Sequence, residues 1–312
     1  MSYANQREWR AIQEFLPADY RITPGTEPAE EWWEVEGHRI HLDTYRDPDA
    51  PVKVILLHGV GTNGRQMSLV LGRPLAARGY ETIAIDMPTY GVTEVADGAL
   101  VTYDDWVRLG SALVDRERAD GRPVVLYGLS AGGMETYHVA SVNGDVAGII
   151  GMTFLDQRSR RVRVRTAFDP VTGLVGARLM ALLARTPLRR LRLPMRWVSK
   201  MRTLVNDRAA QRACYADRTS AGNSASVAFL DSYLNHVPAT EPADFAVCPV
   251  LLTQPAADRW TPMELSEPFL AGITRVPVRT VLLENAGHYP LEQPGLDQLV
   301  EAAAAFCAEV AG

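Results

Sequence analysis

The sequence predicts an α/β fold: a mainly parallel, eight-stranded twisted sheet with helices on both faces. Short apolar runs alternate with helix-length stretches along most of the 312 residues, which is the pattern of strands linked by helical crossovers. The composition, 47% hydrophobic and 22% charged, provides enough apolar material for a large core. Residues 157–240 interrupt the alternation once and are expected to be mostly helical.

The expected strands follow one another with turn residues between them. The first two, 31–36 and 38–45, are separated by Gly37 and are expected to pair antiparallel. The run PVKVILL at 51–57 is β-branched and almost wholly apolar, which is typical of a strand buried on both faces. Five further strands are expected at 80–85, 123–127, 146–154, 248–253 and 276–283.

Four helices are expected between these strands, at 65–77, 103–119, 131–142 and 295–310. The second opens on Thr102, a favourable capping residue, and its Trp106, Leu109 and Leu113 recur at helical spacing. We therefore divide the chain into three parts: an N-terminal extension expected to be helical (1–30), a core (31–156 and 241–312) and an inserted cap (157–240).

Cysteine usage and the apolar runs suggest a compartment. Cys214, Cys248 and Cys307 are odd in number and far apart, which indicates neither a disulfide framework nor a metal cluster. The polar N-terminus lacks the apolar core of a signal peptide, and the apolar runs are shorter than the roughly 18 residues of a membrane span. We expect a cytoplasmic protein without a transmembrane segment.

The charge is segregated along the chain. Residues 158–212 hold 14 Arg and one Lys against two Asp, so the remainder must be strongly acidic to reach the net charge of −5. One interpretation is a solvated, Arg-rich helical face; the other is a basic face that weakly attracts anionic substrates or anionic lipid surfaces. Arg and Val alternate in 158–165, which suggests a strand with one basic face. The same run is equally consistent with affinity for nucleic acid, but no other feature of the sequence supports a nucleic-acid partner.

The first candidate catalytic residue is Ser130, in the sequence GLSAG at 128–132. An apolar strand precedes this G-x-S-x-G pattern and a helical stretch follows it, which is typical of a serine on a tight strand-to-helix turn. Such a turn strains the backbone at the serine and tolerates only small neighbours. Ser130 is therefore the predicted nucleophile.

A histidine and an acid follow the last two expected strands. A serine hydroxyl needs a base to take its proton, and His288, just after the last strand, is the candidate. Asp258, after the preceding strand, is the candidate acid that orients the imidazole. Asp156 is a rival for that role, whereas Asp86 is expected to cap the turn after its own strand.

Together these residues resemble the α/β-hydrolase family, and the resemblance covers about residues 31 to 310. The chain order Ser130, Asp258, His288 is the order of that family. Three further segments are similar to family motifs: HGVG at 58–61, DMPTYG at 86–91 with Thr89 where glycine is usual, and GHYPLEQP at 287–294.

The resemblance implies several roles. The backbone N–H groups of Val60 and Ala131 would form an oxyanion hole, and His58 would brace the loop before it. Gly132 and Gly133 would let helix and strand approach closely, and the cap would cover the active site. Serine at the turn argues against dehalogenase or epoxide hydrolase chemistry, which relatives perform with aspartate there. No metal or organic cofactor is implied.

The predicted function is hydrolysis of carboxylic esters through an acyl-enzyme, with short- to medium-chain or monoacylglycerol-like esters as small-molecule substrates. The same triad would also serve a lactonase, thioesterase, amidase or acyltransferase. Two non-catalytic alternatives stay open: a small-molecule-binding relative, and a scaffold that uses the basic cap. The sequence does not indicate an oligomeric state.

Overall fold

Eight strands form one sheet in the order β1-β2-β4-β3-β5-β6-β9-β10 in the computed structural model, which describes residues 2–312. The β1–β2 and β2–β4 pairs are antiparallel, and the other neighbours are parallel. The predicted fold class is thus confirmed. The strands are β1 Ala29–Val35, β2 His38–Tyr45, β3 Lys53–Leu57, β4 Glu81–Ile85, β5 Val124–Gly128, β6 Gly148–Gly151, β9 Val250–Pro255 and β10 Val278–Leu283.

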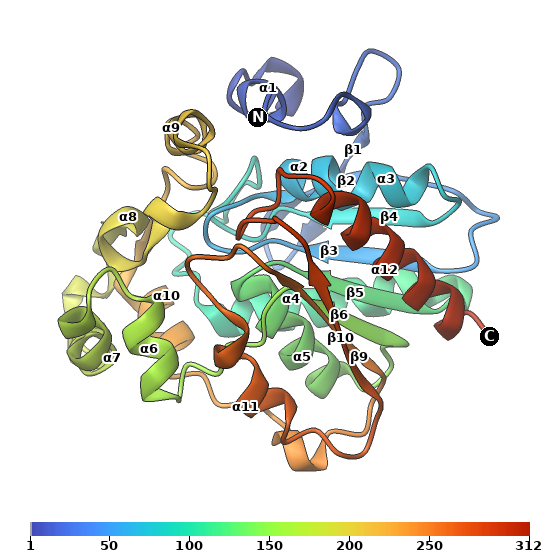
Figure 1. Cartoon of the computed structure of the whole chain (residues 1–312). Helices are drawn as coiled ribbons and strands as arrows, with labels where there is room; N and C mark the ends of the chain where they lie inside the picture. The colour runs from blue at the N-terminus through green and yellow to red at the C-terminus, as the bar shows by residue number, and fades with distance from the viewer. Residues whose placement is uncertain (1) are drawn as a thin grey trace.

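Helices cover both faces of the sheet (Figure 1). One group packs around α12 and the other is the pair α4 and α5. The core helices are α2 Gly64–Met67, α3 Arg73–Ala76, α4 Tyr103–Glu117, α5 Ala131–Asn143, α11 Glu267–Leu270 and α12 Gly295–Val310. The predicted capping by Thr102 is confirmed, since its side chain accepts a hydrogen bond from Asp105 N–H in a reciprocal capping box. The helix expected at 65–77 is interrupted by a π-helical stretch, Ser68–Gly72.

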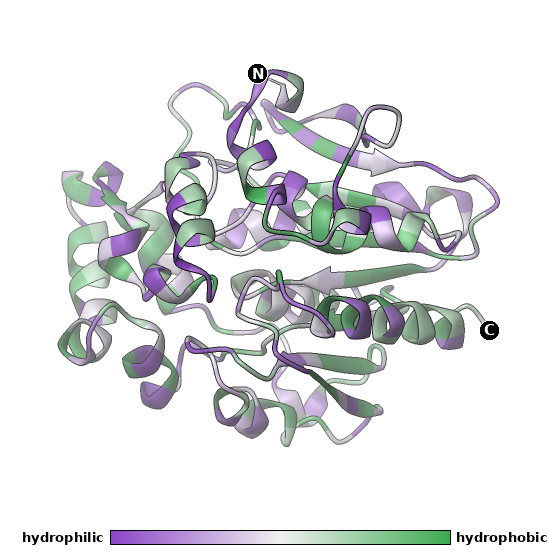
Figure 2. Ribbon diagram, turned by 45° about the horizontal axis from the view of Figure 1, so that its top comes forward, coloured by the Kyte–Doolittle hydropathy of each residue, from purple (hydrophilic) through white to green (hydrophobic). Residues whose placement is uncertain are grey.

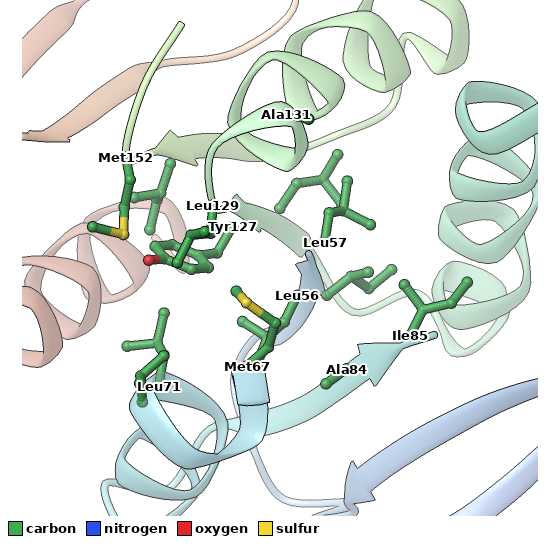
Figure 3. Close-up of a cluster of buried hydrophobic side chains, with 14 of the residues drawn as sticks. Leu56, Leu57, Met67, Leu71, Ala84, Ile85, Tyr127, Leu129, Ala131 and Met152 are labelled. Carbon is green, nitrogen blue, oxygen red and sulfur yellow. The ribbon is translucent and has the colours of Figure 1, made fainter. Parts of the chain in front are cut away.

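The core lies on both sides of the central strands. All five residues of β3 and of β5 are buried, which explains why both strands are almost wholly apolar. Figure 3 shows the cluster where Leu56 of β3 meets Met67, Ala84 and Tyr127, while Leu57 of the same strand lies on the other face of the sheet. This packing holds the carboxyl ends of β3 and β5 beside each other. The HGVG segment at 58–61 follows β3, and the turn that carries Ser130 follows β5.

Residues 157–240 form a group of short elements at one end of the sheet (Figure 1). These elements are α6 Arg160–Thr166, α7 Pro170–Ala184, β7 Arg192–Pro194, α8 Met195–Val198, α9 Arg208–Ala216, β8 Ser224–Ser226 and α10 Val227–Leu234. The expectation of a strand at 158–165 is wrong, because most of this run is helix α6. The Ser159 side chain caps α6 by accepting a hydrogen bond from Val162 N–H.

The N-terminal segment packs into the core. Its one α-helix among residues 2–30 is α1 Glu8–Gln13, which contacts α9. Tyr3 is fully buried and its hydroxyl donates a hydrogen bond to Asp86, 2.9 Å away. The three cysteines are free and buried. None of the helices within residues 2–312 has the length and apolar character that crossing a membrane requires.

Candidate active site

Ser130 occupies the strained turn that the sequence predicts. It lies between β5 and α5 with φ 57° and ψ −119°, a conformation that non-glycine residues rarely adopt. The turn is held by close backbone packing: a Cβ on Gly132 would lie 2.3 Å from the carbonyl oxygen of Leu57, and one on Gly133 would lie 2.2 Å from that of Thr153. The prediction that both glycines provide clearance is confirmed.

The structure joins two of the predicted site residues directly. His288 Nδ1 lies 2.8 Å from Asp258 Oδ2, and both residues are buried. His288 Nε2 is also buried and has no hydrogen-bond partner among residues 2–312. The structure contains no hydrogen bond between His288 and Ser130 within that range. The imidazole is therefore anchored on one side and leaves its other nitrogen available to accept a proton.

Asp258 is held in its ionised form. Burial by itself would raise its pKa, but electrostatic attraction to His288 and hydrogen bonds from His288 and Thr261 outweigh burial and lower the pKa to about 2. Oδ1 accepts hydrogen bonds from the backbone N–H groups of Trp260 (2.7 Å) and Thr261 (2.9 Å). At neutral pH the carboxylate is thus charged, fixed in orientation and aimed at the imidazole.

Sequence reasoning missed Thr261 and Trp260. The Thr261 hydroxyl lies 2.7 Å from Asp258 Oδ2 and 3.1 Å from His288 Nδ1, so it touches both partners. The Trp260 ring packs on the His288 ring with centroids 4.6 Å apart. The signal was present in the run DRWT at 258–261, because an aspartate that accepts the N–H groups two and three residues later forms an Asx-type turn.

The two other acids have different partners. Asp156 accepts hydrogen bonds from the backbone and guanidinium of Arg158 and makes no hydrogen bond or ion pair with His288. Asp86 accepts the N–H groups of Gly64 (2.7 Å) and Val92 (2.9 Å), in agreement with its expected role in the turn after β4. The structure therefore pairs the histidine with Asp258 and leaves the rival Asp156 in a surface ion pair.

The loop after β3 lies against the Ser130 turn. A Cβ on Gly59 would lie 2.9 Å from the Ser130 Cβ and 3.4 Å from the Ala131 backbone nitrogen. The N–H groups of Val60 and Ala131 donate no hydrogen bond to another group of residues 2–312. Two unused donors therefore lie on adjoining loops, where a negatively charged oxygen would satisfy them.

His58 and the turn at 86–91 brace this loop. His58 Nε2 accepts a hydrogen bond from Met87 N–H (3.0 Å), and its Nδ1 lies 2.9 Å from the Gly59 carbonyl oxygen. Burial lowers the pKa of His58, so the ring is neutral and donates from Nδ1. The Tyr90 hydroxyl donates to the Val60 carbonyl oxygen at 3.1 Å. These contacts agree with a structural role for His58.

Thr89 has a left-handed backbone conformation with φ 78°. This is the position where the resembling motif has glycine, and glycine adopts such a φ without steric cost. The Thr89 carbonyl oxygen accepts a hydrogen bond from Asn223 in the cap segment (2.8 Å). The chain therefore keeps the shape of the turn with a residue that strains it.

A cavity of about 320 Å³ opens beside Ser130. Most of its walls are apolar side chains of the cap segment, with Val60, Trp260 and Thr261 contributed by the core. The polar side chains on its lining include Gln157 and Arg163. Among residues 2–312, no group of three or more His, Cys, Asp or Glu side chains is arranged to hold a metal ion.

Comparisons with known proteins identify the family and the fold. The model of the alpha/beta hydrolase family matches residues 54–302. No curated protein matches the chain. Among solved structures, a soluble variant of monoglyceride lipase from Saccharomyces cerevisiae is similar, with 18% identity and a TM-score of 0.71 over 95% of this chain and 98% of that one.

Two further solved structures are similar. Monoacylglycerol lipase from Paleococcus ferrophilus has 17% identity and a TM-score of 0.68, over 87% of this chain and 99% of that one. Epoxide hydrolase A from Mycobacterium thermoresistibile has 20% identity and a TM-score of 0.60, over 90% of this chain and 98% of that one. At these identities the likeness concerns the fold alone.

Proposed function

Because the chain belongs to the alpha/beta hydrolase family, we propose that it is a serine hydrolase that cleaves carboxylic esters through an acyl-enzyme intermediate. The observation that carries the proposal is Ser130, held with φ 57° on the wall of an apolar cavity. A serine that served only the turn would be replaced by glycine at less conformational cost. Its strained placement on a cavity wall is what a nucleophile requires.

In the proposed mechanism Ser130 Oγ attacks the ester carbonyl carbon while His288 Nε2 takes the hydroxyl proton. Asp258 keeps the proton of the imidazole on Nδ1 and stabilises the imidazolium that forms. The N–H groups of Val60 and Ala131 donate to the developing oxyanion, and one such donor contributes about 3 kcal/mol to the barrier reduction. His288 then protonates the leaving alcohol, and water attacks the acyl-enzyme to release the acid.

The substrates that fit this proposal are short- to medium-chain or monoacylglycerol-like esters. The cavity beside Ser130 has predominantly apolar walls, which suit an acyl chain. Two proteins of the same fold, a monoglyceride lipase and a monoacylglycerol lipase, show that this fold accommodates substrates of that class. The similar epoxide hydrolase points to another reaction, but enzymes of that kind in this family use an aspartate where this chain has Ser130.

A serine-directed phosphonate probe and a series of p-nitrophenyl esters test the proposal. The protein should label and hydrolyse at least one ester, with a preference among acyl chain lengths set by the cavity. Ser130→Ala should abolish labelling and lower kcat by about 10⁴-fold or more. Turnover that survives this substitution, or a folded protein that neither labels nor hydrolyses any ester, would contradict the proposal.

A further inference from the structure

Helix α7 is apolar on two sides. Its buried residues are Gly173, Ala177 and Met180, which face the rest of the protein. A second apolar stripe on the same helix is exposed: Val171 67%, Leu174 44%, Val175 52%, Leu179 47% and Leu182 63%. These five residues, the α7 stripe, recur at the helical spacing that normally packs into a core. Arg178 is the one charged residue of α7 and is exposed on the same outer side. An outer side that is apolar apart from one basic residue is suited to a second partner.

The exposed apolar surface continues along the chain beyond α7. Leu188, Leu191 and Trp197 are 50%, 49% and 61% exposed. Helix α7 lies at the outer end of the molecule, away from the sheet (Figure 1). In Figure 2 the helices of this region mix hydrophobic and hydrophilic segments, whereas the central strands are mainly hydrophobic. Such a patch at the end of a molecule marks an interaction surface.

The same region carries positive charge that the protein does not neutralise. Within residues 2–312, Arg158 is the only one of the fourteen arginines of 158–212 with an ion pair to an acid. The two acids of that stretch cap helices: Asp169 accepts a hydrogen bond from Thr172 N–H in α7, and Asp207 accepts from the N–H groups of Ala209 and Ala210 in α9. Of the other thirteen, Arg163, Arg190 and Arg192 donate hydrogen bonds to backbone oxygens of the protein. The other ten guanidinium groups are available to an anionic partner.

Two of these arginines lie beside exposed aromatic rings. The Arg202 guanidinium carbon lies 5.5 Å from the centroid of the Phe168 ring, and that of Arg196 lies 5.7 Å from the Trp197 ring. Trp and Phe next to Arg, together with an apolar helical stripe, are the composition of a surface that lies in the headgroup region of a membrane.

We propose that this surface docks on an anionic phospholipid bilayer. The α7 stripe and Trp197 would enter the interface between headgroups and acyl chains, and the arginines would lie against lipid phosphates. Charge selects this occupant over a second copy of the chain, because two copies face to face would bring two strongly basic segments together. The α7 stripe favours the bilayer over nucleic acid, because nucleic acid offers phosphates but no apolar layer.

Docking would bring the cavity to the lipid. Val171, Val175, Leu179 and Trp197 are exposed and also line the cavity beside Ser130. An amphiphile leaving the bilayer would thus pass from one apolar surface to another without crossing water. The inference goes beyond the proposed function and does not depend on it, since binding can be measured on Ser130→Ala as well as on the unaltered chain.

Vesicle flotation tests the docking surface. Vesicles of phosphatidylcholine alone are compared with vesicles that also contain phosphatidylglycerol, at low and high salt. We expect binding to the anionic vesicles to exceed binding to the neutral ones about tenfold or more, and to fall as salt shortens the Debye length. Failure to bind anionic vesicles, or equal binding to neutral ones, would overturn the proposal.

Matched variants locate the surface. Leu174→Ser/Leu182→Ser/Leu188→Ser removes apolar groups that do not line the cavity and should lower vesicle binding about tenfold while hydrolysis of a water-soluble ester is unchanged. The control Phe15→Ser/Val142→Ser/Leu282→Ser changes three exposed apolar residues outside the cap, which are 36%, 55% and 52% exposed. It should bind vesicles like the unaltered chain.

Three results with these variants would overturn the inference. The first is that the Leu174→Ser/Leu182→Ser/Leu188→Ser variant, the cap variant, binds vesicles as well as the unaltered chain does. The second is a dimer, seen by sedimentation velocity without lipid, that forms with the unaltered chain and the control but not with the cap variant. Such a result would mean that a second copy of the chain covers this surface. The third is that the unaltered chain binds duplex DNA but not vesicles, and that the cap variant binds the DNA more weakly. Circular dichroism verifies that both variants are folded.

Discussion

Replacing Asp258 by Asn tests the acid of the proposed triad, and the structure sets the expected size of the effect. The surroundings lower the pKa of Asp258 from 3.8 to about 2. Since one pKa unit corresponds to about 1.36 kcal/mol, they favour the charged carboxylate by about 2 kcal/mol. An interaction of that size, made with the imidazolium that forms during the reaction, corresponds to a rate factor of about 30.

A second effect adds to the loss of charge. Asparagine at 258 presents an amide N–H to His288 Nδ1, which favours the tautomer with its proton on Nε2. That tautomer cannot accept the Ser130 proton, and the loss then reaches about 10⁴-fold in kcat. We therefore expect Asp258→Asn to lower kcat by at least about 30-fold and at most about 10⁴-fold.

The assay is steady-state hydrolysis of the best p-nitrophenyl ester, with Asp156→Asn as the matched control. Asp156 lies in a partly exposed ion pair with Arg158, so its replacement should change kcat by less than about twofold. Asp258→Asn with nearly full activity, or a larger loss from Asp156→Asn, would refute the assignment.

Stability gives an independent readout of the same contact. The folded-state pKa of Asp258 lies below its unfolded value, so the carboxylate contributes stability above about pH 4, and that contribution is lost as pH falls through about 2. Asp258→Asn should therefore lower the free energy of unfolding by about 2 kcal/mol at pH 7. Urea denaturation at that pH measures the change.

Three further substitutions test the frame around the site. Gly132→Ala would place a Cβ 2.3 Å from a backbone oxygen of β3, so urea denaturation should show a loss of about 3 kcal/mol and labelling by the phosphonate probe should fall. Thr89→Gly relieves a β-branched residue at φ 78° and keeps its carbonyl hydrogen bond; the melting temperature should rise with a gain of about 1 kcal/mol, and a loss would contradict the strain. Glu135 is fully buried without a hydrogen-bond partner among residues 2–312, and burial raises its pKa well above the ordinary range. Above about pH 4.5 the folded state then binds more protons than the unfolded state, so the free energy of unfolding falls by up to about 1.36 kcal/mol per pH unit. In urea titrations Glu135→Gln should remove this pH dependence. The control Glu301→Gln, at an exposed position, should leave the pH dependence unchanged.

Most of the fold was predictable because its signals are local. The buried strand at 51–57 is apolar whatever surrounds it, and Thr102 caps its helix through atoms three residues away. The wrong prediction at 158–165 concerns a run in which an Arg/Val alternation also fits a helix, since Val162 is buried while Arg160 and Arg161 face outward. In so short a run the pattern does not distinguish the two structures, and the cap at Ser159 decides for the helix.

The sequence by itself determined the candidate site residues, because a small-residue turn after a strand and polar residues after two later strands are readable along the chain. Only the tertiary structure decided that His288 hydrogen-bonds to Asp258 and not to Asp156. It also decided that Thr261 joins that pair and that the α7 stripe is exposed. These outcomes depend on contacts between residues far apart in the chain, and periodicity and spacing describe only the faces that each segment offers to such contacts.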